Sequence, residues 1–375
     1  MRILLVNQYA PPDQSPTSRL LGDIAEFFKA SGHIVDAVAD SASYRAHYQR
    51  RGSRLARELK SLASITGRIL KVTRPDLIIA FSSPPCLLAG VAAVAALRRV
   101  PVVHWAMDLY PDLAISLGEL RQPVLISFFR RLMRWAYHRC VLIVALDDDM
   151  AAHLSKAYGV QTEVLPPWPP LGPGIGPADR ISVGAQIAAT EWTWLYSGNL
   201  GRAHEWKILL DTQAELERRN LPIQLLFEGG GAQWETAKAY AQQRKLQSCF
   251  WTGYVSEEES ATTFAASRLI VATQRVEARG LLWPSKLARV LATDKPLLWI
   301  GARHGAIAES LGDRAFTACF ERNESSVVAD WIQELMHRPG TIDSAGQVPL
   351  EPLLRIRAAS CARFADWIMR TRIKQ

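Results

Sequence analysis

The sequence is short of cysteine pairs, of long apolar runs and, over one stretch, of acidic residues. Its cysteines stand far apart, at Cys86, Cys140, Cys249, Cys319 and Cys361. No two of them have the spacing of a zinc site or of a disulfide framework, so we expect a reducing compartment and no cysteine chemistry. The longest apolar run, residues 86–97, falls well short of the roughly 20 residues that a membrane-spanning helix needs, and it predicts a buried helix.

The amino terminus has no signal-peptide pattern. Residues 1–7 form a short run of leucine and β-branched residues, which is typical of a strand, so we expect the protein in the cytoplasm. The length of 375 residues suits two domains of roughly 150 to 200 residues each. A composition of 49% hydrophobic and 21% charged residues is typical of a soluble globular enzyme and excludes a disordered or fibrous protein.

The net charge of +8 is unevenly spread. Residues 45–74 hold nine lysines and arginines against one acid, Glu58, with leucine and isoleucine at helical spacing. A second basic amphipathic segment covers residues 125–135. Such segments suit an anionic membrane surface, to which each basic residue contributes about 1 kcal/mol. Nucleic acid is a second interpretation, and two ordinary packing helices with solvated faces are a third.

Apolar strands alternate with helical patterns in both halves of the chain. In the first half we expect strands at residues 2–7, 34–39, 76–81, 102–106 and 141–146. In the second half we expect strands at residues 193–196, 223–227, 249–251, 269–272 and 297–300, and helices around residues 205–218, 233–244 and 257–266. Continuous apolar strands separated by helices predict parallel sheets covered on both faces, which bind ligands at the carboxyl ends of their strands.

Residues 166–178 separate the two halves, because six prolines and three glycines forbid regular structure there. The predicted fold class is therefore α/β, with two Rossmann-like parallel-sheet domains. We expect residues 1–170 to form the first domain and residues 171–350 the second. Residues 351–375 follow, helical over 353–373; this tail could close the second domain or cross back onto the first.

One helix start in the second half has the features of an anion site. Gly280 makes a turn, Pro284 suits the first turn of a helix, and a hydroxyl and an ammonium follow it. Unpaired N–H groups and the positive end of the helix dipole point out of such a start. We therefore expect a diphosphate there, bound by the backbone, Ser285 and Lys286. The alternative is a surface helix with a solvated lysine.

Short motifs follow one another in order along nearly the whole chain. They are RILLVNQYAPP (2–12), SGH (31–33), DLYPD (108–112), LG (117–118), VLPPW (164–168), YSGNLGR (196–202), FEGGG (227–231), GYV (253–255) and PSK (284–286). In this order the chain resembles the bacterial glycosyltransferases with the two-Rossmann GT-B fold. Specifically, it resembles the retaining family 4 and, within it, the exopolysaccharide and O-antigen enzymes related to the colanic-acid transferases.

The resemblance implies that a nucleotide-sugar donor binds the second domain, across a cleft from an acceptor-binding first domain. The donor-binding positions would be Gly198, Asn199, Glu228, Gly229, Gly230, Tyr254, Val255, Pro284 and Ser285. As catalytic residues, Arg202 and Lys286 would stabilise the charge on the departing nucleoside diphosphate in place of a metal ion, so we expect no metal and no cofactor. The alternative for the glycines is a set of plain strand-to-helix turns.

One position departs from the family pattern. Family members of the Pro-Ser-Lys subgroup carry a ribose-binding glutamate five residues after the proline, where this chain has Arg289. The nearest counterparts of a further family glutamate, Arg279 and Leu281, are not acidic either. Glu277 is the only nearby carboxylate, and it is out of register by two or more residues. The sequence leaves open what binds the ribose.

Asp108 lies just past a predicted strand of the first domain, where a carboxylate could take the acceptor proton or hold a sugar. We rank it as the catalytic acid–base candidate ahead of Asp112 and His104. The alternative is that Asp108 caps the following turn. Hydroxyls in the loop after the first strand open a helix, and the acceptor-binding candidates are Ser15, Thr17, Arg19 and Asp112.

Residues 147–149 are three consecutive aspartates, and Asp-x-Asp is the metal-binding signature of the other glycosyltransferase fold. Here they follow a strand and open a helix, so we interpret them as helix capping. His204 and His304 are interpreted as surface or core residues, although His204, which is near Arg202, could touch the donor.

The predicted function is metal-independent, retaining transfer of a sugar from a nucleoside-diphosphate donor, a UDP-sugar, to a polyprenyl-diphosphate-linked saccharide in cell-surface polysaccharide biosynthesis. We expect a peripheral protein at the anionic inner face of the cytoplasmic membrane, with no nucleic-acid partner. Two alternatives stay open. One is a nucleotide-sugar epimerase or hydrolase of the same fold; the other is a transferase-like partner protein that has lost catalysis, which the missing glutamates favour.

Overall fold

The computed structural model describes residues 1–13, 15–40, 54–169, 192–312, 314–338 and 350–373. The chain divides into two compact units. The first unit comprises Met1–Pro170, Gly280–Trp283 and Arg355–Gln375, and the second comprises Leu171–Arg279 and Pro284–Leu354. The expected basic residues at positions 45, 50 and 51, and most of the proline-rich segment, lie outside the described residues.

The first unit is built on a six-stranded parallel sheet with strand order β2-β1-β3-β4-β5-β6. The strands are β1 (Arg2–Val6), β2 (Ile34–Val38), β3 (Leu77–Ala80), β4 (Val102–Trp105), β5 (Cys140–Ala145) and β6 (Glu163–Val164). Every residue of the two inner strands β3 and β4 is buried, because helices cover both faces of a parallel sheet. The five strands expected in this half are confirmed, and the two-residue edge strand β6 was not expected.

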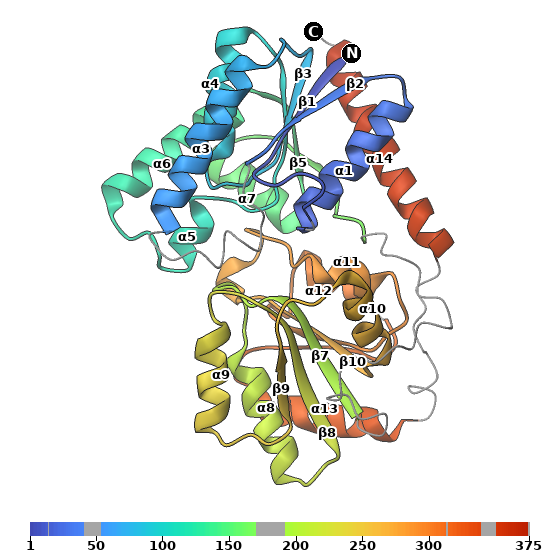
Figure 1. Ribbon diagram of the computed structural model, residues 1–375. Helices are drawn as coiled ribbons and strands as arrows, with labels where there is room; N and C mark the ends of the chain where they lie inside the picture. The colour runs from blue at the N-terminus through green and yellow to red at the C-terminus, as the bar shows by residue number, and fades with distance from the viewer. Residues whose placement is uncertain (14, 41–53, 170–191, 313, 339–349, 374–375) are drawn as a thin grey trace. The chain divides into compact units, whose positions relative to one another are not determined.

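Helices cover the two faces of this first sheet. They are α1 (Pro16–Ala30), α3 (Arg54–Lys71), α4 (Leu87–Arg98), α5 (Asp112–Ser116), α6 (Pro123–Tyr137) and α7 (Asp148–Tyr158). Figure 1 shows α3, α4 and α6 on one side of the sheet and α1 on the other. The apolar run expected to form a buried helix is α4, seven of whose residues are buried.

The carboxyl-terminal helix α14 (Leu350–Ile373) packs on the first unit beside α1 (Figure 1). The ring of Phe364 is fully buried, with its centroid 5.3 Å from that of Trp105. Arg357 pairs with Asp23 of α1 at 3.0 Å. Trp168 donates to the same carboxylate at 2.7 Å. The sequence left two alternatives for the carboxyl-terminal helix. In the structure, this helix packs on the first half of the chain and does not close the second domain.

A short segment of the second half also belongs to the first unit. Asp108 and Leu282 form an isolated antiparallel bridge, and Leu109 N–H donates to Leu281 C=O at 2.8 Å. Gly280 has a φ of +67°, and a Cβ there would lie 2.8 Å from the carbonyl oxygen of Asp149. Only glycine fits this approach without strain. The backbone just before Pro284 is therefore fixed against the first unit.

The second unit is a second six-stranded parallel sheet, with strand order β12-β11-β10-β7-β8-β9. Its strands are β7 (Trp192–Asn199), β8 (Ile223–Gly230), β9 (Cys249–Thr252), β10 (Leu269–Thr273), β11 (Leu297–Ile300) and β12 (Thr317–Phe320). Its helices are α8 (Lys207–Arg218), α9 (Trp234–Gln243), α10 (Glu257–Ala266), the 3₁₀ turn η1 (Val276–Ala278), α11 (Lys286–Leu291), α12 (Ala306–Leu311) and α13 (Ser325–His337). The predicted fold class, two Rossmann-like parallel sheets, is confirmed.

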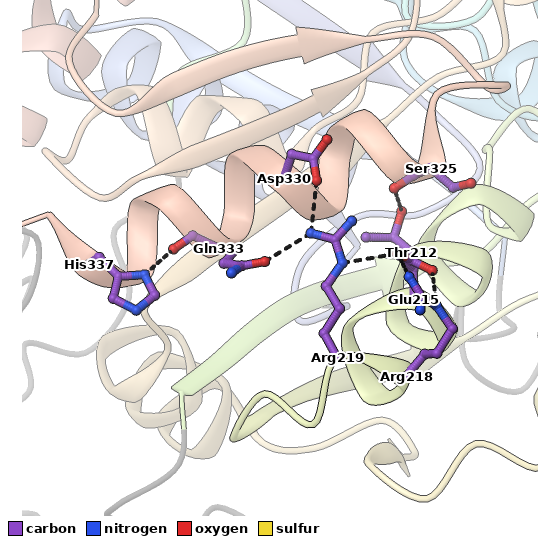
Figure 2. A network of polar contacts seen from close by, with 8 residues as sticks. All are labelled: Thr212, Glu215, Arg218, Arg219, Ser325, Asp330, Gln333 and His337. Atoms are coloured by element: carbon purple, nitrogen blue, oxygen red, sulfur yellow. Dashed lines mark hydrogen bonds and ion pairs between the residues drawn. The ribbon is translucent and has the colours of Figure 1, made fainter.

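Polar contacts join α8 to α13 on one side of the second sheet (Figure 2). The guanidinium of Arg219 pairs with Glu215 at 2.9 Å and with Asp330 at 2.8 Å, and it also donates to Gln333 at 2.9 Å. Thr212 donates to the carbonyl of Ser325 at 3.3 Å. These contacts hold α8 and α13 together.

None of the described helices has both the length and the apolar composition that crossing a bilayer requires.

We predict that the contact between α14 and the first unit contributes strongly to stability. Phe364→Ala removes a fully buried ring from the aromatic cluster with Trp105, so the free energy of unfolding should fall by about 3–5 kcal/mol in urea titrations followed by circular dichroism. Met369→Ala, on the same helix but exposed, should change it by less than about 0.5 kcal/mol. Equal effects of the two changes would contradict this.

Candidate active site

The ends of β7 and β8 form the candidate donor site of the second unit. These parallel strands pair in register, Gly198 opposite Gly229 and Asn199 opposite Gly230, so their carboxyl ends meet at one edge of the sheet. Ligands of open parallel sheets bind at this edge. The motif residues at positions 198–199 and 228–230, expected to bind the donor, are thus brought together.

The glycines at this edge are required by packing within the unit. Gly229 has a φ of +130°, and a Cβ there would lie 2.3 Å from the carbonyl oxygen of Gly198. A Cβ on Gly230 would lie 2.7 Å from the ring of Tyr254. The interpretation of the glycines as strand-to-helix turns therefore has a structural basis of its own, whether or not a phosphate also approaches them.

Lys286 is the first residue of α11, and its side chain lies against the end of β7. The Nζ atom is 3.2 Å from the ring centroid of Tyr196, and a Cβ on Gly198 would lie 3.6 Å from its Cε. This nitrogen is buried and has no hydrogen-bond partner among the described residues. Burial lowers the pKa of Lys286 well below the usual lysine range.

His204 lies beside this lysine. Its Nδ1 is 2.7 Å from the carbonyl oxygen of Thr273, which can only accept, so Nδ1 carries the proton. Burial, together with the neighbouring charge of Lys286, lowers the pKa of His204 to about 3. The imidazole is therefore neutral at physiological pH and does not provide a second cation here.

Glu228 is buried at the end of β8 and accepts two hydrogen bonds. The hydroxyls of Ser197 and Ser260 each donate to its Oε1 at 2.7 Å. The carboxylate is thus oriented by one residue of β7 and one of α10. Asn199 lies nearby in the register of the sheet, and its Oδ1 is buried with no donor among the described residues.

The remaining donor candidates differ in exposure. Arg202 is exposed in the loop between β7 and α8, and Ser285 is exposed without capping α11. Tyr254 and Val255 are partly buried, whereas Pro284 is buried. Because α11 has only six residues, its dipole is small, and the expected anion site depends on the lysine more than on the helix start.

The residues that replace the family glutamates are engaged elsewhere. Glu277 pairs with Arg322 at 2.8 Å and with Arg275 at 3.5 Å. Burial opposes ionisation, but these arginines outweigh it and hold the pKa of Glu277 below its usual range. Arg289 places its guanidinium 4.2 Å from the ring centroid of Phe264. The carboxylate of Glu277 is thus paired with two arginines, and the guanidinium of Arg289 lies over the ring of Phe264.

In the first unit, the two candidate aspartates lie in different surroundings. Asp108 is exposed just past the end of β4, where its backbone bridges to Leu282. Asp112 is buried and accepts from Arg130 at 2.9 Å, from His153 at 3.2 Å and from the hydroxyl of Tyr158. Burial raises its pKa, but these donors outweigh burial and leave the pKa lowered.

The other first-unit candidates have structural contacts. His104 is buried and donates through Nδ1 to the carbonyl of Ala80, and burial lowers its pKa to about 4. Ser15 caps α1 by accepting from Ser18 N–H. Thr17 accepts from Asn7 at 3.2 Å.

Asp147 caps α7 by accepting from Met150 N–H at 2.7 Å, which confirms the capping interpretation for this residue, and Asp148 and Asp149 lie in the first turn of the helix. Among the described residues, no three histidine, cysteine or carboxylate side chains come together as a metal site would need.

Sequence reasoning did not single out Tyr196, whose ring lies under the lysine. A signal was present, because side chains two residues apart in a strand share a face, and Tyr196 and Gly198 are both in β7. The partners of Glu228 carried no such signal, because Ser260 lies in α10, far from it along the chain.

Comparison with known proteins supports a transferase. Residues 17–170 match the family model described as Glycosyltransferase Family 4, and residues 179–341 match the one described as Glycosyl transferases group 1. No curated protein matches the sequence. Sucrose-phosphate synthase from Thermosynechococcus elongatus is similar over 100% of both chains, with 14% sequence identity and a TM-score of 0.72.

Two further solved structures have the same fold. Anabaena HepE in complex with UDP-glucose is similar over 98% of this chain and 100% of its own, with 17% identity and a TM-score of 0.64. The lipopolysaccharide outer core galactosyltransferase WaaB, in its apo form, is similar over 96% of this chain and 99% of its own, with 14% identity and a TM-score of 0.52.

The two sheets and the two family models together define a GT-B fold. The protein is a glycosyltransferase, the first half of which matches family 4 and the second half group 1.

We predict that Gly229 tolerates no side chain. Gly229→Ala places a methyl group against the backbone of Gly198 at a positive φ, so it should lower the free energy of unfolding by about 2 kcal/mol or more in urea titrations. Gly253→Ala is the matched control, because nothing lies within 4 Å of its added Cβ, and its effect should stay within about 0.5 kcal/mol. A neutral Gly229→Ala would disprove the close approach.

We predict a pH-dependent contribution from Asp112. Because the pKa of Asp112 is lower in the folded protein than its usual value of 3.8, the ionised carboxylate stabilises the fold at any pH above 3.8. This contribution is lost as the pH falls through the lowered pKa. Asp112→Asn should therefore lower the free energy of unfolding by about 3 kcal/mol at pH 7, and the difference should narrow below about pH 4. Asp366→Asn, which removes an exposed pair with Arg370, should change it by no more than about 0.5 kcal/mol. A difference independent of pH would argue against this assignment.

Proposed function

We propose that this glycosyltransferase moves a sugar from a UDP-sugar to a lipid-linked saccharide at an anionic membrane surface, with retention of configuration and without a metal ion. The matched family models support nucleotide-sugar chemistry. So do two similar structures: one is a complex with UDP-glucose, and the other, a lipopolysaccharide galactosyltransferase, also supports a cell-surface product.

The observation that carries the proposal is the buried Nζ of Lys286. A buried donor without a partner destabilises a fold by about 1–3 kcal/mol, and by more when it is charged. A ligand that accepts a hydrogen bond from this buried nitrogen would remove that cost. At the carboxyl edge of the sheet, beside the glycine at position 198, the missing partner has the character of an anion.

The diphosphate of the donor suits this position. Its bond to the sugar breaks with negative charge developing on the departing phosphate, and a nearby ammonium stabilises that charge most in the transition state. The low pKa of Lys286 in the free enzyme means that its protonation state can change when the donor binds. A bound diphosphate favours the ammonium form, so binding takes up a proton in the pH range between the free and bound pKa values.

In the first unit, the exposed carboxylate of Asp108 is the proposed group that receives the acceptor proton, because Asp112 is already saturated by three donors.

We predict that Lys286→Met raises stability while removing donor binding. Methionine fills a similar volume without a buried, unpaired amine, so the melting temperature of the ligand-free enzyme should rise by a few degrees. Affinity for UDP, measured by titration calorimetry, should fall by at least about 100-fold. In the native enzyme, the heat of binding in buffers of different ionisation enthalpy should reveal proton uptake.

Lys207→Met is the matched control, because Lys207 also lies over a tyrosine ring, that of Tyr240 at 5.6 Å, but is exposed. It should leave UDP affinity unchanged. A Lys286→Met enzyme that melts lower and binds UDP as the native enzyme does would show that the lysine is structural.

A further inference from the structure

Helix α6 of the first unit has two apolar faces, only one of which is used for packing. Met133, Ala136 and Tyr137 are buried toward α4 and the sheet. The opposite face is exposed at Val124 (80%), Leu125 (44%), Phe128 (57%) and Trp135 (38%). Single exposed apolar residues need no explanation, but a row of them on one helix marks an interaction site.

The exposed residues form one stripe. Val124, Phe128 and Trp135 are separated by four and seven residues, a spacing that places them on the same side of an α-helix. Arg131 falls on this stripe, between Phe128 and Trp135. It is exposed, and it makes no hydrogen bond or ion pair with the part of the chain that the structure describes.

The stripe lies in a basic part of the sequence. Residues 120–146 contain five arginines and no aspartate or glutamate. Arg139 places its guanidinium 5.7 Å from the ring centroid of Trp135, at the end of the stripe. A tryptophan and arginines beside exposed aliphatic and phenyl groups combine an apolar surface with a positive rim.

We propose that this face of α6, made of Val124, Leu125, Phe128, Arg131 and Trp135, docks the enzyme on an anionic lipid bilayer. The proposal rests on the proposed lipid-linked acceptor, and it names the element that brings the enzyme to that acceptor. Apolar side chains enter the interface of the headgroups and acyl chains, while arginines remain among the phosphates.

Charge distinguishes this occupant from a second copy of the chain. In a two-fold dimer the same patch meets itself, so Arg131 and its basic neighbours would face the arginines of the second copy. Residues 120–146 contain no acidic residue to compensate this positive charge. An anionic bilayer complements both the apolar stripe and the positive rim.

Helix α3 extends the surface. It covers the same face of the sheet as α6 (Figure 1), and α4 contacts both helices. Its outward side exposes Leu59 and Leu70, together with Lys60 and Lys71. Exposed apolar residues beside basic ones are thus found on both α6 and α3.

The test is flotation of the full-length protein with vesicles that contain phosphatidylglycerol, compared with vesicles of phosphatidylcholine alone. The native protein should float with the anionic vesicles. Phe128→Ser with Trp135→Ser should lower its partition coefficient by at least about tenfold, through lost apolar burial. Arg131→Glu should lower it by about tenfold on anionic vesicles alone. Val327→Ser, at an exposed aliphatic residue of α13 in the second unit, should have no effect.

Undiminished flotation of both α6 variants would overturn the proposal, as would equal flotation with neutral vesicles. Sedimentation without lipid is the further arm: a native dimer that the α6 changes dissociate would assign the face to a second copy instead. The UDP affinity of each variant separates the two proposals. A variant can lose membrane docking and still bind UDP, and a protein that does not bind UDP can still float with the vesicles. If the double variant does not fold, Arg131→Glu alone decides.

Discussion

The contact between the Nζ of Lys286 and the ring of Tyr196, 3.2 Å from its centroid, is the interaction on which the proposed chemistry of the second unit depends. An aromatic face attracts a cation, but it does not replace the hydrogen bonds that the ammonium lost on burial. The lysine is therefore held in place and left unsatisfied. His204 does not relieve this, since it is neutral and its protonated nitrogen is committed to a backbone carbonyl. The unfavourable burial of this group lies where the proposed anionic ligand would offset it.

An unsatisfied group must be positioned by its neighbours, and here the backbone does this. Arg275 N–H donates to the carbonyl of Ala203 at 2.7 Å, and Glu277 is held by Arg322. Each restraint lies within eleven residues before the lysine. None of these restraints uses the Nζ of Lys286, which has no hydrogen-bond partner among the described residues and would be available to the proposed ligand.

The sequence predicted the sheets well because buried parallel strands are continuous apolar runs, as in residues 77–80 and 297–300. It missed β12, Thr317–Phe320, because this edge strand is half-buried and mixes polar with apolar residues. It predicted the association of Lys286 with the end of β7 only through resemblance. It assigned residues 280–283 to the second domain, because neighbours along the chain give no sign of a bridge to Asp108. It predicted a basic amphipathic segment at residues 125–135, but periodicity could not say which apolar residues of α6 pack and which stay exposed.

The two aspartates of the first unit show how burial separates roles that sequence treats alike. Both belong to one short motif after β4, and either could have been an acid–base group. Three donors surround Asp112, so its negative charge is fully compensated within the unit and its lowered pKa makes it a poor proton acceptor. Asp108 is on the surface four residues earlier and is fixed through its backbone. A group that must gain and lose a proton has to be reached by its substrate, and of these two only Asp108 is exposed.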